Sequence, residues 1–61
     1  MERLLKVKEV MDRVGLSRSQ IYRLMDVGEF PLQISVGGRG ASWVASEIEE
    51  WIQARIEERG R

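Results

Sequence analysis

Arg18, Ser19, Tyr22 and Arg23 are the residues whose types and spacing most clearly indicate chemistry, because they recur on one side of a predicted helix. Arginine can donate two parallel hydrogen bonds to guanine, and the hydroxyls of serine and tyrosine commonly reach phosphate oxygens. The bulky aliphatic residues of the same segment fall on the other side. The spacing therefore predicts a helix that enters a DNA groove, as the second helix of a helix–turn–helix does. An ordinary solvated helix face with two arginines is the alternative.

Ser17 and Gln20 match the S-x-x-Q capping box, in which each side chain satisfies a free amide of the first helical turn. The hydroxyl of Ser17 can also meet a phosphate, since helix N-termini attract anions. Gln20 can cap the helix or hydrogen-bond adenine. We expect both residues to begin the helix and to lie beside the same DNA.

A second candidate contact is the glycine-rich run from Gly37 to Gly40, which contains Gly38 and Arg39. Glycine lets a backbone approach another surface closely, and an arginine at a hairpin tip suits a narrow minor groove. A turn that is glycine-rich only because a hairpin needs positive φ angles is the alternative. The run is not a nucleotide-binding loop, because it lacks the Gly-Lys-Ser/Thr ending and precedes a strand.

Hydrophobic periodicity predicts two helices that would position the first group of residues. Apolar residues at i, i+3, i+4 and i+7 favour a helix over about 7–14, and Gly15 is placed to end it in a left-handed conformation. A second helix over about 18–27 follows after a short link, with Gly28 as its stop. The tight connection is typical of a helix–turn–helix.

The remainder of the chain predicts a hairpin and a third helix. Residues 32–36 alternate between apolar and polar, which favours a half-buried strand, and the hairpin then spans about 32–44. Ser46 and Glu49 form an S-x-x-E capping box that would open a last helix over about 46–59. The three large aromatic residues Phe30, Trp43 and Trp51 are expected to pack in the core.

Size and composition exclude several classes of protein. A chain of 61 residues makes one small domain, and at this size only about 60% of the unfolded surface is buried. Cysteine and histidine are absent, so disulfides, the common zinc ligand sets and most catalytic nucleophiles and bases are excluded. We therefore expect no enzyme, no metal and no cofactor. The absence of a long apolar segment and of cysteine favours a cytoplasmic protein without a membrane partner.

Charge is unevenly distributed, although ten basic residues balance ten acidic ones. Residues 1–44 hold seven basic and five acidic residues, a difference of +2, whereas residues 45–61 hold three and five, a difference of −2. One face can thus be positive and suit DNA. The acidic last segment could instead meet a basic protein partner.

Motifs along nearly the whole chain together resemble the AlpA-type prophage transcriptional regulators, which are close relatives of small phage excisionases and of the MerR-like winged-helix domain. These motifs are Arg3-Leu4-Leu5, Lys8-Glu9-Val10, Gly15-Leu16-Ser17-Arg18-Ser19, Ile21-Tyr22-Arg23-Leu24, Gly28, Phe30-Pro31, Gly37-Gly38-Arg39, Trp43 and Glu47-Ile48-Glu49-Glu50-Trp51-Ile52.

The resemblance implies a mainly α fold with a small β-hairpin, a winged helix–turn–helix of the excisionase and MerR N-terminal type. The helix after Ser17 would be the recognition helix, and the hairpin tip at Gly38 and Arg39 would be the wing. Many relatives carry a basic residue before the hairpin tryptophan, where this chain has Ser42. Fewer cations near the wing should weaken attraction to the DNA backbone.

The sequence therefore predicts sequence-specific binding to double-stranded DNA for transcriptional control of a prophage or mobile element. An excisionase that bends DNA is the nearest alternative, and a protein-interaction module that inhibits a regulator is the alternative from another class. A neutral monomer should bind weakly alone, so adjacent copies on DNA, or an integrase or regulator partner, would raise its affinity. The predicted DNA contacts are Ser17, Arg18, Ser19, Gln20, Tyr22, Arg23, Gly38 and Arg39.

Overall fold

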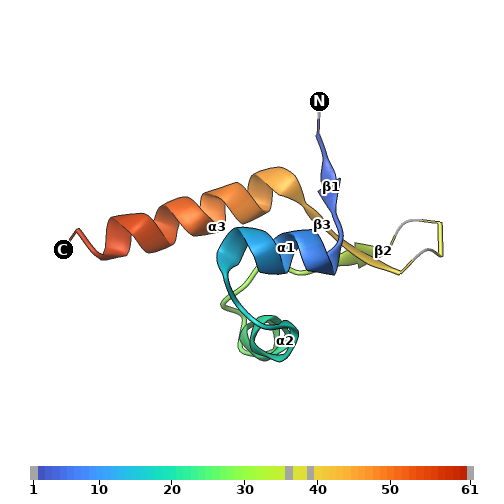
Figure 1. Cartoon of the computed structure of the whole chain (residues 1–61), viewed down its shortest axis with the longest axis horizontal. Helices are drawn as coiled ribbons and strands as arrows, with labels where there is room; N and C mark the ends of the chain where they lie inside the picture. The colour runs from blue at the N-terminus through green and yellow to red at the C-terminus, as the bar shows by residue number, and fades with distance from the viewer. Residues whose placement is uncertain (1, 36, 39, 61) are drawn as a thin grey trace.

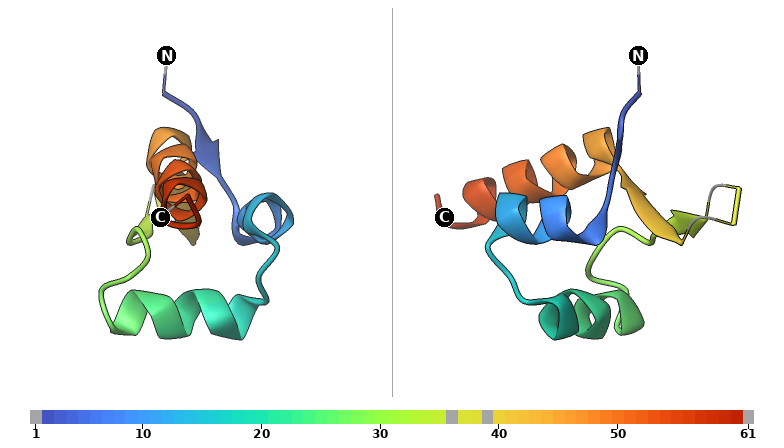
Figure 2. Two further views of the ribbon diagram at one scale, coloured as in Figure 1. Left: turned by 90° about the vertical axis from the view of Figure 1, so that its left-hand side faces the viewer. Right: turned by 45° about the vertical axis from the view of Figure 1, so that its right-hand side comes forward.

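The computed structural model describes residues 2–35, 37–38 and 40–60, and in these residues three helices lie to one side of a small antiparallel sheet (Figure 1). Helix α2 runs beneath α1 and α3, crossing the direction of α3 (Figure 2). The chain is therefore mainly helical with a small sheet. Its elements are β1 (Leu4–Leu5), α1 (Val7–Val14), α2 (Arg18–Asp26), β2 (Ile34–Ser35), β3 (Ala41–Val44) and α3 (Ala45–Glu58).

The sheet has three strands in the order β1-β3-β2 rather than the two of a simple hairpin. Leu5 of β1 lies opposite Trp43 of β3, and Ile34 of β2 lies opposite Ser42. Strand β1 is only two residues long, which is too short for a period-two pattern to reveal it. The sheet therefore joins the N-terminal segment to the hairpin.

Strand β2 begins later and is more exposed than the alternation of residues 32–36 predicts, and Val36 of that stretch lies outside the described residues. Among the described residues of the stretch, Ile34 and Ser35 pair with β3, and the side chains of Leu32 and Ile34 are 64% and 41% exposed. The expectation of a half-buried strand is wrong for these residues. Helices α1 and α3 pack against β3, so the edge strand β2 has no helix over its apolar side chains.

One hydrophobic core connects the segments. Six segments contribute one buried hydrophobic residue apiece, so no element has a core of its own. The segments are the three helices, strands β1 and β3, and the α2–β2 connection. These residues are Leu5, Val10, Ile21, Phe30, Trp43 and Ile48. The arrangement makes the position of each helix depend on all the others.

Both indole N–H groups donate hydrogen bonds to the α2–β2 connection. Trp43 Nε1 donates to the carbonyl oxygen of Pro31 and Trp51 Nε1 to that of Glu29, each at 2.9 Å. Phe30 lies between these two carbonyls, and its ring meets that of Trp51 edge-on at 4.9 Å between centroids. The predicted core position is confirmed for Trp43 and Phe30, whereas Trp51 is half-buried.

Helix α3 begins at Ala45, and the capping box predicted for Ser46 and Glu49 is wrong. The backbone N–H and the hydroxyl of Ser46 both donate to the carboxylate of Glu2, at 3.2 and 2.9 Å. The hydrogen bond from the hydroxyl, followed by that from the backbone, lowers the pKa of Glu2. The capping box fails because β3 runs directly into α3, and a carboxylate 44 residues away satisfies the first turn.

Candidate nucleic-acid interface

A tight turn at Gly15 sets the position of α2 relative to α1. Gly15 adopts a left-handed conformation with φ of 72°, and its N–H donates to the carbonyl oxygen of Met11 at 2.8 Å. A residue with a Cβ rarely adopts this φ, which confirms the predicted role of Gly15. Leu16 follows and packs, half-buried, against the core.

The start of α2 is held by the predicted capping box. The N–H of Gln20 donates to Ser17 Oγ at 3.2 Å, and the N–H of Ser17 donates to Gln20 Oε1 at 2.9 Å. Ser19 Oγ lies 3.4 Å from Ser17 Oγ. The capping role of both residues is confirmed, so the first turn of α2 has a defined geometry before any ligand binds.

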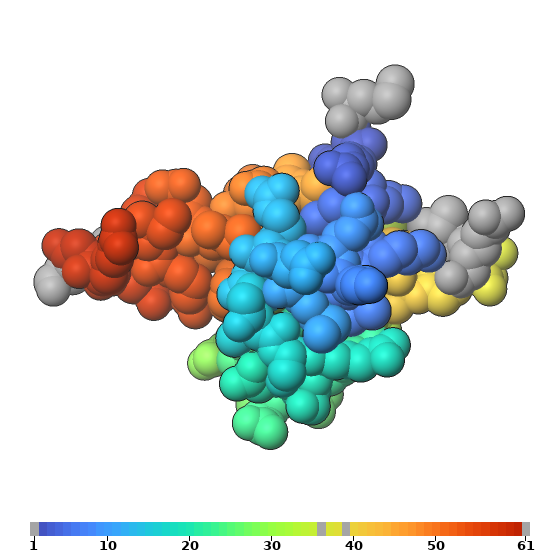
Figure 3. Space-filling model, in the orientation of Figure 1, coloured from blue at the N-terminus to red at the C-terminus, as the bar shows by residue number. Residues whose placement is uncertain are grey.

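The outer side of α2 presents two arginines to solvent. Arg18, Ser19 and Arg23 are exposed, whereas Ile21 on the inner side is fully buried. Within the residues that the structure describes, neither arginine pairs with a carboxylate. Figure 3 shows α2 at the lower edge of the molecule. Two guanidinium groups are therefore available to donate hydrogen bonds to an external acceptor.

Tyr22 lies at the boundary between the outer and inner sides of α2. Its half-buried ring meets the ring of Trp43 edge-on at 6.3 Å, and its hydroxyl donates to Gln33 Oε1 at 3.1 Å. Tyr22 thus fastens α2 to the segment before β2. Sequence analysis missed Gln33, because the contact joins residues eleven positions apart and has no local signal.

The predicted wing lies beyond β2. Gly38 is exposed with φ of 69°, and Arg39 lies outside the described residues. Strands β2 and β3 project to one side of the molecule, at the right of Figure 1. The structure therefore brings together the six predicted residues of α2 and its cap, and it places Gly38 on a separate projection.

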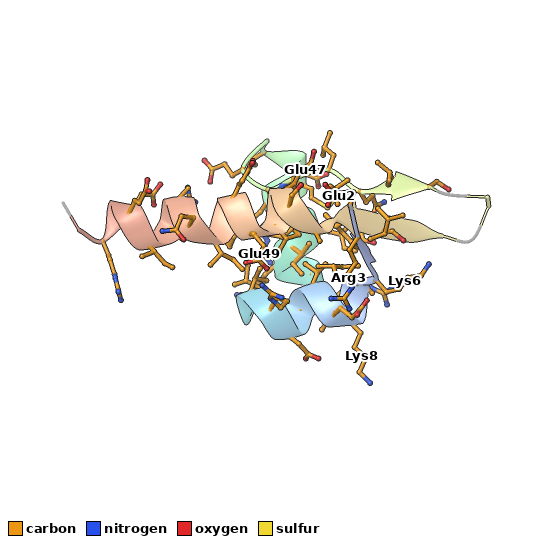
Figure 4. The ribbon with its side chains drawn as sticks, turned by 90° about the horizontal axis from the view of Figure 1, so that it is seen from above. Glu2, Arg3, Lys6, Lys8, Glu47 and Glu49 are labelled. Atoms are coloured by element: carbon orange, nitrogen blue, oxygen red, sulfur yellow. The ribbon has the colours of Figure 1, made fainter. Side chains whose placement is uncertain are left out.

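Ion pairs reduce the positive character of the first two-thirds of the chain. Arg3 pairs with Glu9 at 3.1 Å, and Arg13 of α1 pairs with Glu49 of α3. These pairs are partly exposed, so each contributes little to stability. Glu9 is already counted in the net charge of residues 1–44, whereas Glu49 belongs to the acidic last segment and offsets one further cation. Figure 4 shows Lys8 pointing away from the body near the start of α1.

Two further properties of the described residues bear on the sequence predictions. None of the helices in this part of the chain has the length and apolar composition needed to cross a lipid bilayer. In the same residues, acidic side chains do not gather in threes as candidate metal ligands.

Comparison with known proteins identifies the family. The model of the prophage CP4-57 regulatory protein (AlpA) family matches residues 3–56. The uncharacterized protein ORF88 of Enterobacteria phage P4 is 52% identical over 60 residues, which cover 98% of this chain and 68% of that protein. The DNA-binding transcriptional activator AlpA of Escherichia coli (strain K12) is 27% identical over 59 residues, covering 87% and 84% of the two chains. This chain therefore belongs to the AlpA family of prophage regulatory proteins.

Proposed function

We propose that this protein is a winged helix–turn–helix regulator that binds double-stranded DNA sequence-specifically and controls transcription of prophage genes. The observation that carries the proposal is the outer side of α2, where Arg18 and Arg23 are exposed and make no ion pair with a described residue. The regulatory description of the family and the DNA-binding description of the Escherichia coli relative support it.

In this proposal α2 enters the major groove by its N-terminal half. Arg18 and Ser19 lie in the first turn, where recognition helices contact base edges, and Ser17 and Gln20 hold that turn in shape. Arg23 is five residues further on, about 7.5 Å along the helix axis. Five residues also turn the helix by about 140°, so the two arginines flank the outer side of α2 and would contact different parts of the binding site.

Tyr22 and the wing complete the proposed interface. The Tyr22 hydroxyl donates its one hydrogen to Gln33 Oε1, so it would bind a phosphate only by exchanging Gln33 for the phosphate oxygen. Gly38 and Arg39 would lie on the adjacent backbone or minor groove, because glycine allows close approach and arginine suits a narrow groove.

The test begins by selecting a binding site from a random double-stranded oligonucleotide library and measuring affinity by fluorescence anisotropy. Arg18→Ala and Arg23→Ala should each weaken binding about 5- to 150-fold, as loss of a base contact of about 1–3 kcal/mol does. Arg39→Ala should weaken binding to all sequences and reduce the salt slope by about 1.

Arg59→Ala is the matched control, since it removes the same charge at the C-terminal end of α3, which extends away from α2 (Figure 1). Its effect should be less than about twofold, because exposed charges beyond the Debye length of ~10 Å are largely screened. Retained affinity in the Arg18→Ala, Arg23→Ala double variant, or equal losses in the variant and the control, would overturn the proposal.

A further inference from the structure

A groove of about 1120 Å³ lies between the α2–β2 connection and α3. In Figure 4, seen from above, this connection lies on one side of α3 and α1 on the other. The groove contains Trp51 of α3 and the exposed side chains of Leu32 and Ile34. Leu32, Ile34 and Trp51 form what we call the apolar floor of the groove, on the flank of α3 that faces away from α1. The guanidinium of Arg55 lies over the Trp51 ring, 5.2 Å from its centroid, so Leu32 and Ile34 are the more accessible part of this floor.

The rim of the groove is acidic. Glu47, Glu50 and Glu58 of α3 line it, and Glu29 of the connection does so as well. The one cation among the described lining residues is Arg55, which pairs with Glu58 at 2.7 Å. The rim thus carries four carboxylates and one guanidinium, which is already paired, so its net charge is negative. A phosphate backbone would be repelled here, so the rim excludes nucleic acid as the occupant.

The pairing of an apolar floor with an acidic rim defines the chemistry of a complementary surface. It needs apolar side chains along its centre and cations along its edges, as a basic amphipathic helix has. From Glu47 to Glu58, α3 advances about 16 Å, or roughly three helical turns. A partner helix of similar length can therefore lie along it, with its cations facing the carboxylates.

We propose that this groove binds a basic amphipathic segment of another protein. The site goes beyond the proposed DNA contact and does not depend on it, because Arg18 and Arg23 do not line the groove. A second copy of this chain fits less well. None of its described elements combines an exposed apolar stripe with several cations that make no ion pair.

The experiment titrates the isotopically labelled full chain with a synthetic helical peptide that carries leucine at i, i+3, i+4 and i+7 and lysine on both edges. A peptide with glutamate in place of lysine is the charge control. The lysine peptide should shift the indole N–H resonance of Trp51 and the amide resonances of Leu32 and Ile34 saturably. The glutamate peptide should leave them unchanged.

Charge-neutralising variants then locate the interaction. The double variant Glu47→Gln, Glu50→Gln should weaken binding of the lysine peptide about fivefold, as loss of two partly exposed ion pairs does. Glu57→Gln should change the affinity less than twofold, because Glu57 is on the same helix but does not line the groove. Leu32→Ser should weaken binding without changing its salt dependence.

Three results would overturn the proposal. Absence of groove shifts at millimolar peptide would show that the surface does not bind such a segment. Equal weakening by Glu57→Gln and by the double variant would reduce the effect to general charge attraction. The resonances of the groove residues could also shift with protein concentration in the absence of peptide. If the double variant Glu47→Gln, Glu50→Gln abolishes those shifts, the occupant of the groove is a second copy of the chain.

Discussion

Replacement of Trp43 by Phe tests whether the indole hydrogen bond to Pro31 is a main support of the fold. Trp43 is fully buried, and its N–H donates to the Pro31 carbonyl oxygen at 2.9 Å. Trp51 makes an equivalent bond to Glu29, also at 2.9 Å, but is only half-buried. The two variants Trp43→Phe and Trp51→Phe therefore make the same chemical change at two levels of burial.

The structure predicts a large difference between these variants. In Trp43→Phe, the partly buried Pro31 carbonyl loses its donor, which costs about 1–3 kcal/mol, and the smaller ring loses about 1–2 kcal/mol of burial and packing. The total, roughly 2–5 kcal/mol, is a large share of the roughly 3–9 kcal/mol expected for a domain of this length. In Trp51→Phe, water can replace the lost donor, so the cost should be about 0.5–1.5 kcal/mol.

Urea unfolding followed by far-ultraviolet circular dichroism measures both free energies of unfolding, and a thermal scan of the same signal measures the melting temperatures. Trp43→Phe should lower the melting temperature by roughly 8–40 °C, and Trp51→Phe by roughly 2–12 °C. Wild-type protein and Arg59→Ala serve as references, because Arg59 is exposed at the end of α3. Two results would refute the reasoning: an equal loss of unfolding free energy in Trp51→Phe and Trp43→Phe, or wild-type unfolding of Trp43→Phe. Either result would show that burial of the Trp43 hydrogen bond does not stabilise the protein.

Two further predictions concern single carboxylates. Hydrogen bonds with Ser46 lower the pKa of Glu2 from 4.5. The ionised carboxylate therefore stabilises the folded protein fully at pH values above the pKa of Glu2 in the unfolded chain, and this stabilisation is lost as the pH falls through its lower pKa in the folded protein. The urea midpoint should therefore fall less in Glu2→Gln than in the wild type between about pH 5 and pH 3, the range in which a carboxyl group titrates. An equal fall of the midpoint in both proteins would contradict this prediction. Asp26 is exposed and lies three residues after Arg23, on the outer side of α2. Asp26→Asn should raise DNA affinity about two- to tenfold at low salt, with a smaller gain at high salt, in the same anisotropy assay; an unchanged or reduced affinity would place Asp26 away from the phosphates.

Local signals predicted the parts of the candidate interface that depend on neighbouring residues. The left-handed turn at Gly15 and the capping box of Ser17 and Gln20 involve groups within about one helical turn. The periodic apolar stripe also predicted that Ile21 faces inward. Such features follow from backbone sterics and from side-chain spacing, so a sequence carries them directly.

Similar local signals failed where distant residues compete. The S-x-x-E pattern at Ser46 is a valid capping box in isolation, but Glu2 takes the serine hydrogen bonds once β1 pairs with β3. The alternation that includes Leu32 and Ile34 predicted burial, yet no helix covers that edge of the sheet. The same missing cover gives the groove its apolar floor.

The sequence by itself determined that this chain is a small, mainly helical protein with a cationic outer side on its second helix, and its motifs indicated the AlpA family. Only the tertiary structure decided that Tyr22 turns partly inward to Trp43 and Gln33, and that Arg13 is neutralised by Glu49. The reason is physical. Helical periodicity and capping arise within a few residues, whereas burial and ion pairing depend on which distant segments the single shared core brings together.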